Sequence, residues 1–203
     1  MKKELILNII GIIFLVFGIG AIINTLLHLE QGLAPLLWFS YIGLILLAIG
    51  VFRRDSYLIA SQLCILGIPY ILWDIDFFAH LIIQGTFLGI TDYFFVSGPL
   101  IGKIISSQHL FNLPLSLLAV YLIGLKRKDF WKLAFFEMAV LFFITKLVTN
   151  SMQNVNCVYH NCANFDFGIW YPLEWFLAYF VIILISNYVV VKIFYYGKRH
   201  KNL

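Results

Sequence analysis

The stretch LILNIIGIIFLVFGIGAIINTLL, residues 5–27, contains no charged side chain. An α-helix rises about 1.5 Å per residue, so about 20 apolar residues cross the roughly 30 Å hydrocarbon core of a bilayer. The stretch is long enough for one crossing and longer than the apolar part of a cleaved signal peptide. It therefore predicts a membrane-spanning helix that is retained as an anchor.

The composition of the whole chain favours the same class of protein. Hydrophobic residues make up 62% of the 203 residues, charged residues make up 12%, and the mean hydropathy is +0.94. Soluble domains are about half apolar and about a quarter charged. So few charges cannot cover a soluble monomer, and an aromatic content of 18% excludes a disordered chain. The composition predicts an integral membrane protein.

Five further apolar runs of helical length follow the first. The six predicted transmembrane helices are 5–27, 34–52, 57–77, 110–125, 131–149 and 171–194. No even series of short alternating strands occurs, so the predicted fold is all-α, a polytopic membrane helical bundle. Residues 1–203 are expected to form a single integral membrane domain with no soluble domain.

Basic residues are concentrated on one side of these helices. That side carries Lys2, Lys3, Arg53, Arg54, Lys126, Arg127, Lys128, Lys132, Lys198, Arg199 and Lys201. The positive-inside rule places this side, and with it both termini, in the cytoplasm. We expect a multi-pass protein of the cell membrane, specifically a prokaryotic plasma membrane. Membrane lipids account for the basic clusters, and no nucleic-acid partner is expected.

The two charged cytoplasmic turns are similar in sequence. Residues 49–57, IGVFRRDSY, align without gaps with residues 123–131, IGLKRKDFW. One explanation is a parallel duplication of a helical hairpin, with repeats at 40–77 and 114–151. The other is convergence, because Arg and Lys suit the end of a helix and Asp suits the start of the next.

The connection between the third and fourth predicted helices, residues 80–107, is unusually apolar. It is too interrupted by Gly, Asp and Ser to span the membrane and too apolar for a loop in water. We therefore expect an interfacial or re-entrant segment on the external face.

Polar side chains gather in the outer third of the predicted membrane. Counted by helical rise from the cytoplasmic ends, this layer contains Asp74, Asp76, His80, His109, Asn112, Lys146 and Glu174. Just beyond it lie His28, Glu30, Asp92, His160 and Asp166. An ionisable residue inside a membrane costs about 2.5–3.5 kcal/mol, which makes each one a functional candidate. The alternative is an interfacial polar layer that joins helices by hydrogen bonds.

Two charged groups are expected to find partners inside the bundle. Lys146 is the deepest cation, and Glu174 on the next helix is its expected ion-pair partner. Nearer the cytoplasm, Glu137 is expected to hydrogen-bond to Gln62 or Asn187.

Three residues of the outer layer are candidates for catalysis: His109, Asp76 and His80. Asp76 and His80 are four residues apart, so they share a face of a continuous helix. There the Asp76 carboxylate could orient the His80 imidazole as a general base, or the two side chains could share a metal. His109 opens a helix, where the helix dipole favours the neutral imidazole that a general base needs. The binding candidates are Asp74, Asn112, Lys146, Glu174 and His160.

The start of the fourth predicted helix, residues 109–114, carries a His-x4-Pro pattern, His109 to Pro114. It resembles the helix start of the membrane acyl-lipid hydrolases related to androgen-induced protein and of their acyltransferase relatives. The resemblance covers this short stretch only, and it implies acyl-lipid chemistry. The Thr or Cys nucleophile of those families has no counterpart in this sequence.

The second long external connection contains two cysteines, in Cys157-Val158-Tyr159-His160-Asn161-Cys162. Because both are predicted in the oxidising compartment, we expect a disulfide that presents His160 at its tip. The alternative is a zinc site with Asp166 or His109 as a further ligand. No other cofactor is predicted, and Cys64 is expected to pack within its helix.

Three functions remain open from the sequence. The first is an enzyme or binding protein that acts on a lipid-like or small amphipathic substrate at the outer leaflet, as the one-sided polar cluster suggests. The second is a small-solute or ion transporter or channel, which the hairpin similarity and the intramembrane charges suggest. The third is a structural or assembly subunit of a membrane complex, with protein partners or further copies of the chain.

Overall fold

The protein is a bundle of α-helices, and the residues that the structure describes form no strand. The computed structural model describes residues 2–28, 32–162 and 170–196. In chain order the helices are α1 (Lys2–Leu27), η2 (Ala34–Leu37), α2 (Phe39–Phe52), α3 (Ser56–Ile83), α4 (Asp92–Phe95), α5 (Leu100–Ser106), α6 (His109–Ile123), α7 (Trp131–Val148), η3 (Val155–Cys157), α8 (Tyr171–Val190) and the π-helical turn η4 (Val191–Tyr196). Each of the apolar runs expected to be helical overlaps one of the longer helices.

Within the described ranges, three helices are long and apolar enough to cross a membrane: Lys2–Leu27, Ser56–Ile83 and Tyr171–Tyr196. The apolar helix Phe39–Phe52 is shorter. Large apolar side chains also cover the outside of the bundle, and Leu5 and Leu147 are 61% and 82% exposed. Such a surface is suited to contact with lipid rather than water. These helices and this surface are compatible with a membrane protein.

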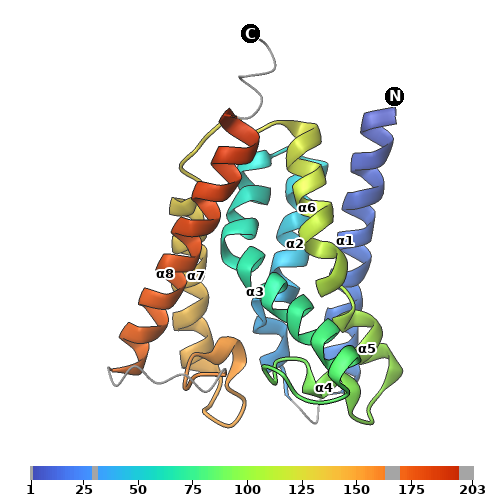
Figure 1. The fold of residues 1–203 in the computed structure, drawn as a ribbon, viewed down its shortest axis with the longest axis vertical. Helices are drawn as coiled ribbons and strands as arrows, with labels where there is room; N and C mark the ends of the chain where they lie inside the picture. Colours follow the sequence, from blue (N-terminus) through green and yellow to red (C-terminus); the bar gives the residue numbers. More distant parts are fainter. Residues whose placement is uncertain (1, 29–31, 163–169, 197–203) are drawn as a thin grey trace.

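The two ends of the bundle differ in composition. Figure 1 shows the start of α1, the end of α8, the α2–α3 turn and the α6–α7 connection at one end, and α4, α5 and the loop around η3 at the other. The first end carries the basic turns, and the second end carries the cysteine pair with His80, His109 and His160. We refer to the second as the outer end, following the topology expected from the sequence.

Helix α3 extends further than expected, to Ile83 rather than to residue 77. It ends at Gln84, whose backbone is left-handed with φ of +52°. The expected interfacial segment then contains only the short helices α4 and α5 and packs back on α3. Asp76 accepts hydrogen bonds from Leu88 N at 2.5 Å and from Thr91 N at 2.7 Å. Asp76 thus holds the segment that follows α3 against the helix.

The two similar turns use their aspartates differently. Asp55 caps α3, because its carboxylate accepts from the backbone N–H groups of Tyr57 at 3.0 Å and Leu58 at 3.2 Å. Asp129 makes no such cap on α7 and instead bonds to Arg127. The duplication remains a prediction.

A polar group is buried near the basic end, where Glu137 was expected to find a partner. The Gln62 side chain donates to Glu137 Oε2 at 2.7 Å, and the Ser61 hydroxyl lies 3.2 Å from the same oxygen. The expected hydrogen bond to Gln62 is confirmed. It joins α3 to α7 across an otherwise apolar contact.

Helices α1 and α2 pack closely because a glycine lies at their contact. A Cβ atom at Gly18 would lie 2.6 Å from Ile45 Cδ1 and 3.3 Å from Leu44 Cβ. Gly20 is on the same helix, and nothing would lie within 4 Å of its Cβ. Of these two glycines, Gly18 is the one that the packing requires.

The substitution Gly18→Val should therefore lower the free energy of unfolding by about 1–3 kcal/mol, since an overpacked contact forces side chains from their rotamers. Gly20→Val introduces the same side chain into open space and should be close to neutral. Thermal denaturation of both variants in one detergent measures the difference. Equal melting temperatures would show that α1 and α2 do not pack as described.

Candidate functional site

A cavity of about 480 Å³ lies at the outer end, between α2, α3, the start of α6, α8 and the two external connections. Aromatic side chains form a large part of its wall: Trp38, Phe39, Tyr41, Tyr70, Trp73, Tyr93 and Tyr179. The polar groups among its described lining are Ser40, Ser106, His109 and Asn156, and no Asp, Glu, Lys or Arg of the described residues lines it. Its volume is in the range of small-molecule sites.

His109 is the catalytic candidate that lines this cavity. Its Nδ1 lies 2.7 Å from the carbonyl oxygen of Ser106. A carbonyl can only accept, so Nδ1 carries a proton, and in the neutral ring Nε2 is then an acceptor. The ring stacks on Trp73 with centroids 4.7 Å apart and meets Tyr70 edge-on at 5.3 Å. The imidazole is held in one orientation, with no hydrogen bond to Nε2 from the described residues.

Asn112 lies behind the cavity wall. Its Nδ2 donates to the hydroxyl of Tyr70 at 3.1 Å and to Gln108 Oε1 at 2.8 Å. Asn112 and Gln108 are fully buried, and within the described ranges Asn112 Oδ1 and Gln108 Nε2 have no partner. Asn112 therefore positions Tyr70 and does not itself line the cavity.

The structure does not bring Asp76 and His80 together. Asp76 is 1% exposed, and its oxygens accept from the backbone of the following segment and from the hydroxyl of Thr91 at 2.8 Å. His80 stacks on Phe95 at 3.8 Å and lies 3.6 Å from Asp92 instead. Asp76 therefore does not orient His80 as a base or share a metal with it, because the carboxylate accepts hydrogen bonds from the loop backbone instead.

Asp76 nevertheless shapes the cavity. The segment it holds supplies Gly89, Ile90 and Tyr93 to the wall. The Tyr93 hydroxyl accepts from the indole N–H of Trp73 at 3.1 Å. Burial raises the pKa of this hydroxyl, and its hydrogen bond with the Ser106 side chain lowers it in part.

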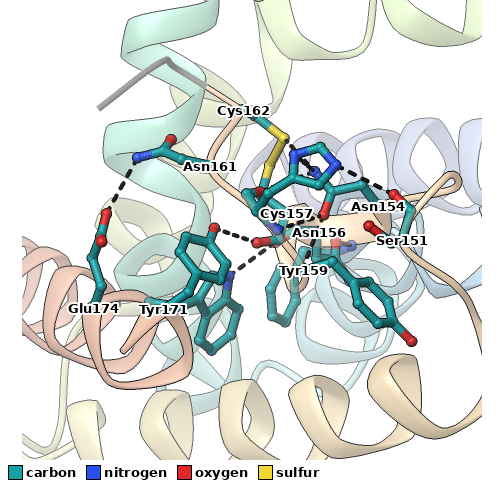
Figure 2. The surroundings of a disulfide bond; sticks show 12 residues. Ser151, Asn154, Asn156, Cys157, Tyr159, Asn161, Cys162, Tyr171 and Glu174 are labelled. Atoms are coloured by element: carbon teal, nitrogen blue, oxygen red, sulfur yellow. Dashed lines mark hydrogen bonds between the residues drawn. A yellow bond between two sulfur atoms is a disulfide. The ribbon is translucent and has the colours of Figure 1, made fainter. Parts of the chain in front are cut away.

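The cysteine pair is a disulfide, which confirms the first interpretation of the motif. Cys157 and Cys162 are bonded (Figure 2). Both line the cavity. Bonded cysteines do not act as zinc thiolates. The described residues contain no group of three or more His, Cys, Asp or Glu that could hold a metal, while Glu30 and Asp166 lie outside them. Cys64 is free and buried, as expected.

His160 is exposed, and its ring is held by hydrogen bonds within the loop. Asn154 Nδ2 lies 3.0 Å from His160 Nδ1, and His160 Nε2 lies 3.2 Å from the carbonyl oxygen of Ser151 (Figure 2). Both ring nitrogens thus have partners. Asn154 Oδ1 also accepts from the backbone of Tyr159 at 3.0 Å.

Asn156 connects the disulfide loop to the start of α2. Its Oδ1 accepts from the backbone N–H of Phe39 at 2.8 Å, and its Nδ2 donates to the carbonyl of Leu37 at 2.7 Å. Its own carbonyl accepts from the indole of Trp175 on α8 at 3.0 Å. One buried residue thus ties η2, α2 and α8 together around the cavity. The sequence analysis did not single it out.

Lys146 and Glu174 do not form the expected ion pair. Lys146 Nζ donates to the carbonyl of Val158 at 3.2 Å and lies 3.7 Å over the Tyr159 ring. Glu174 is buried and accepts from Asn161 at 3.4 Å (Figure 2). The disulfide loop supplies both partners, which the sequence could not indicate. Asp74 has a buried Oδ1 without a partner in the described ranges and does not line the cavity.

Comparison with protein-family models, with curated proteins and with solved structures finds no match to this chain. The assignment of the site therefore rests on its geometry.

The substitution Asn156→Ala should destabilise the fold by roughly 2–4 kcal/mol, since it leaves two backbone groups at the η2–α2 junction without partners. Asn150→Ala is the matched control, because Asn150 is exposed and bonds only to its own turn. Its cost should stay below about 1 kcal/mol. Chemical denaturation in detergent compares the two, and similar losses of stability would contradict the role of Asn156.

Proposed function

We propose that the chain crosses the membrane six times, with both termini in the cytoplasm and the cavity at the external face. Three apolar helices of spanning length support this topology. The basic turns lie together at one end and the disulfide lies at the other, in keeping with the positive-inside rule and an oxidising exterior.

The topology is tested by labelling a single added cysteine in intact cells with a membrane-impermeant maleimide. The native cysteines give little background, because two are bonded and Cys64 is buried. Met152→Cys, at a position 97% exposed beside the disulfide loop, should be labelled, and Lys2→Cys should be labelled only after permeabilisation. Labelling of Lys2→Cys in intact cells would overturn the proposed orientation.

The function that this geometry supports best is binding of an uncharged, lipid-like molecule from the outer leaflet. Aromatic walls suit an apolar or planar body, and a lining without charged side chains among the described residues disfavours a charged head. Ser40, Ser106 and Tyr93 can add hydrogen bonds.

The observation that carries the proposal is the orientation of His109. Its Nδ1 is used by the Ser106 carbonyl, so a ligand hydroxyl can donate to Nε2. An imidazole nitrogen that accepts from a hydroxyl is also placed as a general base. If the ligand reacts, its hydroxyl is the group that His109 would activate.

Three farnesyl compounds test the proposal in protein reconstituted in lipid nanodiscs. Farnesol has a hydroxyl donor, farnesyl methyl ether lacks it, and farnesyl phosphate is anionic. Quenching of tryptophan fluorescence reports binding, because Trp38 and Trp73 line the cavity. Farnesol should bind most tightly, and the ether should lose about 2- to 10-fold, the value of one hydrogen bond.

His109→Gln should reduce the difference between farnesol and its ether. His28→Gln is the matched control, since His28 Nδ1 also bonds to a backbone carbonyl, that of Asn24 at 2.8 Å, but His28 does not line the cavity. Equal binding of farnesyl phosphate and farnesol would reject an uncharged ligand. No binding of any of the three compounds would reject the lipid-binding function itself.

The transporter alternative predicts that replacement of Glu137 strongly impairs function. This carboxylate lies near the basic end and bonds to Gln62 and Ser61, away from the cavity lining. An outer-leaflet binding protein should tolerate Glu137→Gln in the farnesol assay.

A further inference from the structure

A second hollow, of about 370 Å³, lies at the opposite end of the bundle, between the α2–α3 turn and the α6–α7 connection. Four cationic side chains line it: Arg53, Arg54, Lys126 and Arg127. Asp55 is the single acid among its described lining. This hollow is separate from the outer cavity and shares no lining residue with it.

Contacts between the two turns form this hollow. The Arg127 guanidinium lies 4.1 Å over the ring of Tyr57. The Tyr57 hydroxyl donates to the backbone carbonyl of Asp129 at 3.2 Å. Because these contacts join the start of α3 to the connection before α7, the basic side chains are gathered without any ligand.

Two of the four cations already have acidic partners. Arg54 pairs with Glu4 at 2.5 Å and also donates to Asn8 at 2.7 Å. Arg127 forms two hydrogen bonds with Asp129, at 3.0 and 2.9 Å. The Arg127 guanidinium holds the pKa of the Asp129 carboxyl below its usual value, so this pair stays charged near neutral pH.

Within the described part of the chain, the other two cations have no ion-pair partner. Arg53 and Lys126 are exposed, and the structure gives them no acidic partner within the described ranges. Asp55 Oδ1 caps α3 through the backbone N–H groups of Tyr57 and Leu58, and the described residues show no ion pair between Asp55 and either cation. Two cations without an acidic partner therefore line a hollow that the protein forms without a ligand.

We propose that this hollow binds a phosphate group between Arg53 and Lys126. An Arg guanidinium and a Lys ammonium are the usual protein donors to phosphate oxygens. At the cytoplasmic surface of a membrane, the abundant source of phosphate is an anionic lipid headgroup, and a soluble phosphate compound is the other source. The site does not depend on the function proposed for the outer cavity.

The lipid arm of the test uses nanodiscs that contain phosphatidylglycerol and phosphatidylcholine in equal amounts. Native mass spectrometry of the released protein counts each retained lipid. The wild-type protein should retain phosphatidylglycerol in preference to phosphatidylcholine. In the double variant Arg53→Gln/Lys126→Gln this preference should be at least about 5-fold lower. Lys2→Gln/Lys3→Gln removes two charges from the same end but outside the hollow, and should keep it.

The second arm uses inorganic phosphate with protein in phosphatidylcholine nanodiscs. A phosphate-dependent rise in melting temperature that the Arg53→Gln/Lys126→Gln variant lacks would support the site with a soluble ligand. Lipid preference without this rise would support the site with a lipid ligand. Equal melting temperatures of the variants without phosphate verify folding. If the wild type shows neither response, or the double variant matches it in both arms, the proposal is wrong.

Discussion

Backbone groups outside helices must find hydrogen-bond partners inside the protein, because lipid offers none. At the outer end of this protein, two side chains meet much of that requirement. Asp76 accepts from the backbone that follows α3, and Asn156 bonds to the backbone on both sides of the η2–α2 junction. The cavity exists because these hydrogen bonds hold the irregular segments in place against the helices.

The same constraint explains the contrast between the two ends. At the outer end, charged groups such as Glu174 and Lys146 are taken up by the disulfide loop, and the cavity lining that the structure describes is uncharged. At the basic end, Arg53 and Lys126 face a hollow without acidic partners from the described residues. The outer end is where we propose an uncharged lipid-like ligand, and the basic end is where we propose a phosphate.

Local sequence patterns predicted the helices well, because a run of apolar residues of spanning length has few other structures. The disulfide was also predictable, since its two cysteines are close in sequence and lie on the side opposite the basic turns. The histidine that lines the cavity was chosen from its place at a helix start. These features depend on neighbours in the sequence.

The remaining features depend on contacts between distant segments. Nothing near Asn156 in the sequence indicates that it bonds to Phe39, and nothing near Lys146 indicates the ring of Tyr159 over which it lies. The extension of α3 past residue 77 was missed because Asp74 and Asp76 suggest an interface, whereas Asp76 is buried under the segment that follows. The local sequence offers one indication, the two asparagines themselves. Asn154 and Asn156 both adopt a left-handed backbone, a conformation that asparagine tolerates.

The most direct measurement is a crystal structure of the protein extracted and crystallised with its native lipids. We expect elongated density in the outer cavity, packed on Trp73 and Tyr93, with an uncharged head within hydrogen-bond distance of His109 Nε2. A cavity filled by the aromatic side chains themselves, or a His109 bonded through Nε2 to another part of the chain, would contradict this expectation.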